Sequence, residues 1–317
     1  MKMEKLLLLI LLFTQLSLAW EIPKGLTFKF GGLTPALDLE VRDPNTGATN
    51  INYKPSTQAK TFLAFDYKNL GASISAYNPR DSDFRKKHGD GQFYDLQLRA
   101  TRNEYYLEGY FQSYKGYYLE NASKVMTNPF GSEGQYPLNS SLKAQHYGVQ
   151  IFKFHHPEKF NPRKAIEFVD PSTKSGGSWY YSAALNSHQL STKESLVPAT
   201  AIDNYGSLNN LKNIQSLTAA VGAGVGYSLV MAPNSWVLSG MMGFALGPQW
   251  ASARYTSDRE DRNQFSVKTQ IKLAAGYSGE QFISGINLQY DTTQIRLKSS
   301  ELGLSSLESA LFIGYRF

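Results

Sequence analysis

The feature that most constrains the fold is a strict alternation of apolar and polar side chains in the second half of the chain. Odd positions from 217 to 231 are apolar, while even positions from 216 to 228 are small or hydroxylated, among them Gly222, Gly224 and Gly226. A strand separates such residues onto two faces, whereas a helix would distribute them around its circumference. The pattern therefore predicts a long strand with one apolar face and one polar face.

The same alternation recurs in the next two stretches of the chain. Residues 235–249 place Trp236, Leu238 and Phe244 on one face, and residues 264–278 set Lys268 and Lys272 opposite an apolar face. Strands with lipid on one side and a polar lumen on the other must alternate in this way. We therefore predict an all-β protein, an antiparallel up-and-down transmembrane β-barrel.

Reading the pattern along the whole chain gives about twelve spanning strands. We expect them at residues 36–42, 60–67, 70–77, 92–102, 104–114, 144–154, 177–190, 214–231, 235–249, 264–278, 281–294 and 307–317. Short connections such as 232–234 would face the periplasm, and long polar ones such as 251–263 would face outward. An even number of strands closes the barrel with both termini on the periplasmic side.

Two stretches leave the strand count open between 10 and 14, because strand boundaries read from one sequence are uncertain by roughly 2–4 residues. Residues 155–176 are too long for a periplasmic turn, and the segment KAIEFV within them could itself be a strand. The segment ATNINYKP, residues 48–55, competes with 36–42 for the first strand.

The start of the chain has the features of a secretion signal. Lys2 and Lys5 precede an apolar run at residues 6–13, and residues 17–19 are suited to cleavage. We expect a signal peptide at residues 1–19, which is cleaved, and a single barrel domain at 20–317; a retained anchor is the alternative. The apolar run is shorter than the roughly 20 residues that span a bilayer as a helix.

Composition agrees with an exported barrel in the outer membrane of a Gram-negative bacterium. The chain has 20 Tyr, 18 Phe, 26 Gly and no Cys. An exported chain without cysteine is held together by its fold alone. Its formal net charge of +6 is too small and too scattered to predict nucleic-acid binding.

Three stretches carry a family resemblance. YDLQLRA at 94–100, YLEGYFQSYKGYYLE at 106–120 and KSGGSWYYSAAL at 174–185 resemble the domain of unknown function 4421 family of exported bacterial proteins. The similarity runs from about Leu26 to the C-terminus. The resemblance implies an exported barrel of unassigned function, and it transfers no site residues.

The polar faces of the predicted strands supply the candidate site. Eight residues with inward parity are our lumen-lining candidates: Asp95, Arg99, Glu108, Tyr110, Lys268, Lys272, Asp291 and Glu308. Such charges could pair across a closed interior, or they could set the selectivity of a polar channel. We therefore expect a structural barrel or a narrow passive channel with a charged lumen.

We expect no catalytic, cofactor or metal site. The three alternating glycines lack the strand–turn–helix context of a phosphate loop. His155 and His156 are adjacent on the chain and have no spaced third ligand. His188, with Ser182 and Ser187 nearby, is the best candidate for an alternative function as a lipid hydrolase, although sequence proximity does not define a catalytic triad. A soluble periplasmic or secreted β-protein is a further alternative.

The final strand ends in the aromatic residues Tyr315 and Phe317. An aromatic end after alternating apolar residues resembles the signal by which barrels are recognised for outer-membrane assembly, and aromatic rings suit the interfacial girdle. We therefore expect three partners: outer-membrane lipid, lipopolysaccharide and the barrel assembly machinery.

Overall fold

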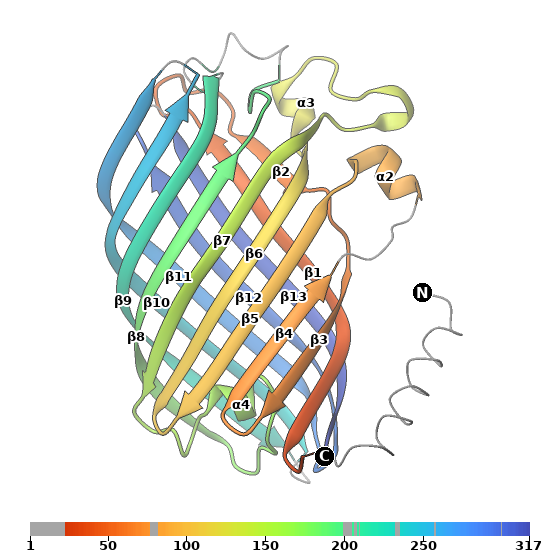
Figure 1. Cartoon of the computed structure of the whole chain (residues 1–317), viewed down its shortest axis with the longest axis vertical. Helices are drawn as coiled ribbons and strands as arrows, with labels where there is room; N and C mark the ends of the chain where they lie inside the picture. Colours follow the sequence, from red (N-terminus) through yellow and green to blue (C-terminus); the bar gives the residue numbers. More distant parts are fainter. Residues whose placement is uncertain are drawn as a thin grey trace.

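Thirteen antiparallel strands form one sheet, and twelve of them close into a ring (Figure 1). The computed structural model describes residues 23–76, 82–198, 205, 208, 210–231, 235–256, 258–298 and 300–317. The predicted signal peptide at 1–19 lies outside the described residues. Strand β1 (Leu26–Arg42) closes the ring by pairing with β13 (Glu301–Arg316), from Thr27 opposite Arg316 to Arg42 opposite Glu301.

The remaining elements follow the chain in order. They are β2 (Ile51–Pro55), β3 (Lys60–Tyr67), β4 (Leu70–Ala76), α2 (Ser82–His88), β5 (Gln92–Arg102), β6 (Tyr105–Leu119), α3 (Ala122–Val125), the 3-10 turn η1 (Ser132–Gly134), β7 (Leu138–Phe154), α4 (Pro162–Ala165), β8 (Gly176–Ser191), β9 (Leu211–Met231), β10 (Trp236–Tyr255), β11 (Arg259–Ser278) and β12 (Phe282–Arg296). No helix in this described part of the chain is both long and apolar enough to cross a membrane.

The ring confirms the prediction of twelve spanning strands. The segment 48–55 does not replace the first strand. It contains β2, a thirteenth strand that pairs with the distal parts of β1 and β6, above the shorter strands β3 to β5. The first strand begins ten residues earlier than predicted, at Leu26 instead of residue 36.

Two other sequence-based assignments were wrong. The segment KAIEFV contains the end of the one-turn helix α4 and no strand. The predicted outward loop at 251–263 is largely strand, because β10 continues to Tyr255 and β11 begins at Arg259. These strand ends have polar or small residues on both faces, so the apolar alternation that marks a membrane span is absent there.

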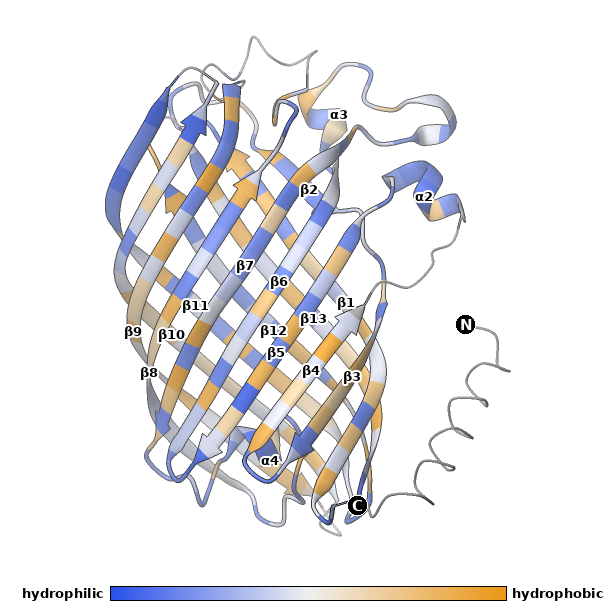
Figure 2. Cartoon of the chain, viewed as in Figure 1, coloured by the Kyte–Doolittle hydropathy of each residue, from blue (hydrophilic) through white to orange (hydrophobic). Residues whose placement is uncertain are grey.

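The half of the barrel that holds the C-terminus, at the bottom of Figure 1, has an apolar outer surface. Leu311, Ile313, Phe282, Leu238 and Phe244 all point outward and are 52–66% exposed. Hydrophobic residues alternate with hydrophilic ones along these strands (Figure 2). This lower half therefore has the apolar exterior of a transmembrane barrel.

The two faces exchange polarity in the upper half. Along β1, Phe28 and Phe30 point outward and Lys29 is buried inside, whereas ten residues further on Glu40 is exposed and Leu39 is buried inside. An apolar interior with a polar exterior is the arrangement of a protein in water. The exchange therefore marks the level at which the barrel leaves the hydrocarbon layer.

Strand length agrees with this division. β10 has 20 residues, which at about 3.3 Å per residue span roughly 66 Å of strand. A strand tilted by about 45° would then rise roughly 47 Å, more than the hydrocarbon core of about 30 Å. The upper part of the barrel therefore stands outside the membrane.

Candidate functional site

The lumen of the upper half is filled by a continuous apolar cluster, the upper core. Strands around most of the ring contribute buried residues to it, among them Leu37, Tyr53, Tyr117, Ile214 and Leu304. The connection between β8 and β9 adds Leu196, Val197, Tyr205 and Leu208. Because these side chains meet from opposite walls, the upper core closes the lumen at its outer end.

The lumen of the lower half is closed by residues 155–176, which we call the plug. Phe160, Ile166 and Phe168 of the plug pack against wall residues such as Phe152 and Tyr180, and all five side chains are buried. Residues 155–176, which are too long for a periplasmic turn, therefore fold inward into the lumen.

Polar contacts hold the plug to the first and last strands. The Arg316 guanidinium donates to the carbonyl oxygens of Phe168 and Val169, both at 2.7 Å. From β1, Lys29 Nζ donates to the carbonyl of Glu167 at 2.8 Å, and Thr27 Oγ1 donates to the carbonyl of Val169 at 3.2 Å. These bonds satisfy plug carbonyls that are buried away from water.

Two of the alternating glycines of β9 make room for buried aromatic rings, one from the plug and one from the wall. A Cβ on Gly226 would lie 2.4 Å from the Phe160 ring, and one on Gly224 would lie 2.3 Å from the Tyr180 hydroxyl. Both contacts are closer than a real Cβ approaches. These two glycines thus leave space for the aromatic rings at the inner wall. They lie mid-strand, outside any strand–turn–helix context.

A charged chamber lies between the two apolar layers. It consists of two neighbouring cavities of about 60 and 90 Å³. All eight lumen-lining candidates lie on the walls of these cavities. Both cavities are large enough to hold groups the size of a water molecule.

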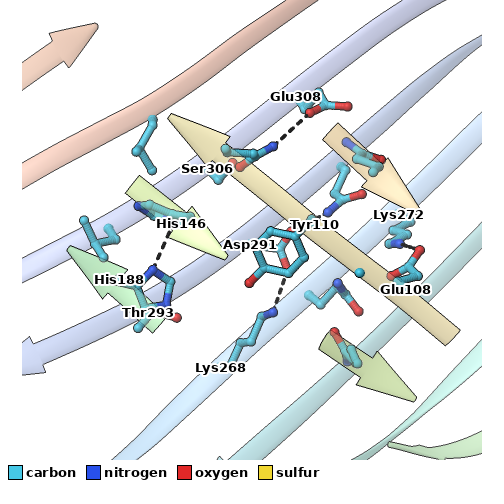
Figure 3. Close-up of a pocket in the computed structure, with 18 of the residues that line it drawn as sticks. Glu108, Tyr110, His146, His188, Lys268, Lys272, Asp291, Thr293, Ser306 and Glu308 are labelled. Atoms are coloured by element: carbon cyan, nitrogen blue, oxygen red, sulfur yellow. Dashed lines mark hydrogen bonds and ion pairs between the residues drawn. The ribbon is translucent and has the colours of Figure 1, made fainter. Parts of the chain in front are cut away.

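Four ion pairs lie in or beside the chamber, and two of them are visible in Figure 3. Lys272 bonds Glu108, and Lys268 Nζ lies 3.6 Å from Asp291 Oδ1. Nearer the plug, Arg99 Nε lies 3.3 Å from Glu167 Oε1. Lys29 Nζ lies 2.9 Å from Asp66 Oδ2. Charges in such surroundings are tolerated only when they are paired.

Two acidic residues of the chamber have no basic partner within 4 Å among the described residues. Asp95 Oδ2 accepts a hydrogen bond from Gln97 Nε2 at 3.0 Å, and Glu308 Oε2 accepts a long one from Gln112 Nε2 at 3.5 Å. Asp95 is 3% exposed. The chamber therefore holds two more acidic than basic side chains.

A pair of histidines lies at one side of the chamber. His188 Nδ1 is 3.0 Å from His146 Nδ1, and both rings are buried. The partner of His188 is thus another histidine; no serine hydroxyl of the described residues forms a hydrogen bond with its ring. His146 was not predicted from the sequence, because an isolated histidine on a polar strand face carries no signal of its own.

His155 and His156 contact different neighbours. His155 stacks on Trp179 with 4.5 Å between the ring centroids, and His156 Nδ1 lies 3.2 Å from Glu158 Oε1. The described residues contain no group of three or more His, Cys, Asp and Glu side chains placed to hold a metal ion.

Tyr315 and Phe317 lie at the lower rim of the barrel. Phe317 is 41% exposed, and its ring centroid lies 4.8 Å from that of Tyr315. Tyr315 in turn lies 5.1 Å from Phe282 on the neighbouring strand. The three rings form an aromatic row at the level expected for a membrane interface.

The family model described as "Domain of unknown function (DUF4421)" matches residues 21–317. The chain belongs to this family. The match confirms the resemblance predicted from the stretches 94–100, 106–120 and 174–185. No curated protein matches the chain.

Several solved structures of outer-membrane proteins resemble this family member. One is the outer membrane protease OmpT from Escherichia coli, with 7% identity, a TM-score of 0.39, and 92% of this chain and 96% of that chain covered. Another is the beta domain of the Bordetella autotransporter BrkA, with 10% identity, a TM-score of 0.42, and 91% and 99% covered. A third is an outer membrane channel from Pseudomonas putida F1, with 10% identity, a TM-score of 0.37, and 93% and 97% covered. Sequence identities and TM-scores this low do not transfer the function of these proteins to this chain.

Proposed function

We propose that this chain is a structural, non-conducting β-barrel of the outer membrane of a Gram-negative bacterium. The observation that carries the proposal is the pair of apolar layers, the upper core and the plug, that close the lumen above and below the charged chamber. Of the two roles expected from the sequence, this arrangement favours the structural barrel over the narrow channel.

The apolar outer surface favours a membrane-embedded barrel over a soluble β-protein. Monomeric soluble proteins rarely expose apolar patches of more than a few hundred Å². Here the apolar exterior continues around the lower half, from Leu311 on β13 to Val149 on β7 and Leu98 on β5. We propose outer-membrane lipid and lipopolysaccharide as the partners of this surface.

We propose the barrel assembly machinery as the partner of Tyr315 and Phe317. Deleting Phe317 should reduce the fraction of the protein that is heat-modifiable and membrane-bound, because the rim loses an outward aromatic ring. Fractionation followed by detergent gels with and without heating measures this fraction. Deleting one residue from the outward connection near Glu133 provides the control. Normal membrane assembly of the protein lacking Phe317 would contradict the assignment.

Liposome swelling tests the proposed function. Proteoliposomes should swell in small sugars no faster than empty liposomes, while an open porin gives fast swelling in the same assay. Swelling whose rate depends on solute size would overturn the proposal in favour of the channel. Phospholipid breakdown that is abolished by His188→Ala would overturn it in favour of the lipid hydrolase.

A further inference from the structure

The pairing of β11 with β12 ends beside the chamber and leaves a seam in the barrel wall. β11 and β12 are paired from Ser278 opposite Ile283 to Thr269 opposite Thr292, and the pairing stops there. Above this level β11 pairs only with β10, and β12 only with β13. Side chains take over part of the bonding across the seam, as where Arg262 donates to the carbonyl of Leu297 at 2.8 Å.

An outer groove of about 560 Å³ lies along this seam. Thr292, Thr293 and Leu304 line both the groove and the inner cavity of about 60 Å³, so that these side chains separate the two spaces. The groove is acidic, because Asp38, Glu40, Glu120 and Glu301 face Arg42 and Lys54. A surplus of acidic groups at an entrance raises the local concentration of cations.

The chamber behind the seam has an excess of hydrogen-bond acceptors. Its buried side-chain atoms without a hydrogen-bond partner are all oxygens, belonging to Asp95, Glu167, Gln270, Asn287 and Asp291. Asp95 and Gln270 are only 3% and 7% exposed. Lys268 Nζ offsets the charge of Asp291 Oδ1 from 3.6 Å. The other unpartnered oxygens are costly to bury unless a ligand supplies positive charge or donors.

Glu308 lies where the two cavities of the chamber meet, because it lines both of them. It shares the cavity of about 90 Å³ with Asp95 and Asn287, and the cavity of about 60 Å³ with Gln270. Figure 3 shows Glu308 apart from the two lysine–carboxylate pairs. The two surplus carboxylates thus line the same cavities as the unpartnered amide oxygens of Gln270 and Asn287.

We propose that Asp95 and Glu308 bind a divalent cation in the chamber, with Ca²⁺ as the ion that suits the donor set best. One divalent ion balances the two unpaired carboxylates. Ca²⁺ accepts irregular sets of carboxylate and amide oxygens, whereas Mg²⁺ requires a nearly ideal octahedron. The inference goes beyond the structural role proposed above and does not depend on it.

Thermal unfolding of the detergent-solubilised full barrel tests the site, with CaCl2 as the probe after treatment with a chelator. An ion bound by the folded state only stabilises that state, so Ca²⁺ should raise the Tm by roughly 5 °C. Titration calorimetry should give one Ca²⁺ per chain. Asp95→Asn combined with Glu308→Gln should abolish both signals and should melt above the wild type in chelator, because two repelling charges are gone.

Substitution of two exposed acidic residues, Glu133→Gln with Asp261→Asn, provides the matched control and should keep the wild-type response. Three results would each overturn the inference. The first is a wild-type Tm that is equal in Ca²⁺ and in chelator, and the second is a Ca²⁺ response that persists in the Asp95 and Glu308 variant. The third is an equal shift with NaCl at the same ionic strength, which would show screening without a site.

Discussion

Replacing Lys272 by Met should destabilise the folded barrel by about 3–5 kcal/mol, the usual effect of removing one partner of a buried ion pair. The Lys272 side chain is 8% exposed and bonds Glu108, which is 13% exposed. Tyr106 donates to the same Glu108 oxygen at 2.8 Å, so the carboxylate would keep one donor and lose its cation. Urea unfolding of the refolded protein in detergent measures the change in the free energy of unfolding.

The double variant Glu108→Gln with Lys272→Met should recover most of this loss, since it removes both charges together. Arg259→Met is the control, because Arg259 and Asp261 form an ion pair in which both side chains are more than 60% exposed. Such exposed pairs contribute at most about 1 kcal/mol. If Lys272→Met were as mild as Arg259→Met, the chamber would be solvated, and the two apolar layers would not isolate it.

Replacing Arg316 by Ala should release the plug from the wall. The Arg316 guanidinium is the donor to three carbonyls, those of Phe168, Val169 and Gly279. Phe168 also holds a left-handed backbone conformation, with φ of 54°, which costs a non-glycine residue roughly 1–3 kcal/mol and persists only when its surroundings enforce it. Without Arg316, the carbonyl of Phe168 loses its guanidinium donor, the carbonyl of Val169 keeps only Thr27 Oγ1, and the Phe168 conformation loses its restraint.

Limited proteolysis measures the release of the plug. Trypsin should cut the Arg316→Ala variant after Lys159, Arg163 or Lys164 at least ten-fold faster than the wild type, because the local opening costs less. Arg316→Lys should be intermediate, since one ammonium replaces a fork of donors. Arg296→Ala, which removes a partly exposed pair with Glu301 far from the plug, should leave the cutting rate unchanged. An unchanged rate in Arg316→Ala would show that apolar packing alone holds the plug.

The sequence allowed the ring of strands to be predicted because side-chain alternation is a local property. Residues 214–231 and 264–278 carry the pattern without interruption, and both lie within observed strands. The inward positions of Asp95, Glu108 and Lys272 followed from parity alone, since neighbouring residues on a strand point to opposite faces.

The upper core and the plug, which close the lumen, could not be predicted in the same way. The upper core depends on side chains such as Leu37 and Leu304. They belong to the same alternation, but here the apolar face points into the barrel instead of toward lipid. The plug depends on Phe160 and Phe168, whose burial follows from the path of the chain back into the barrel. The pairing of Arg99 with Glu167 likewise joins residues 68 positions apart (167 minus 99) through that path.

Planar-bilayer recording tests the sealed barrel most directly. The variant to record lacks residues 160–169, replaced by a short Gly-Ser linker, so that only the upper core still closes the lumen. This variant should remain as electrically silent as the wild type, because apolar side chains from opposite walls fill the outer half. Steady conductance steps from either protein would contradict the central claim and would make the charged chamber part of an open path.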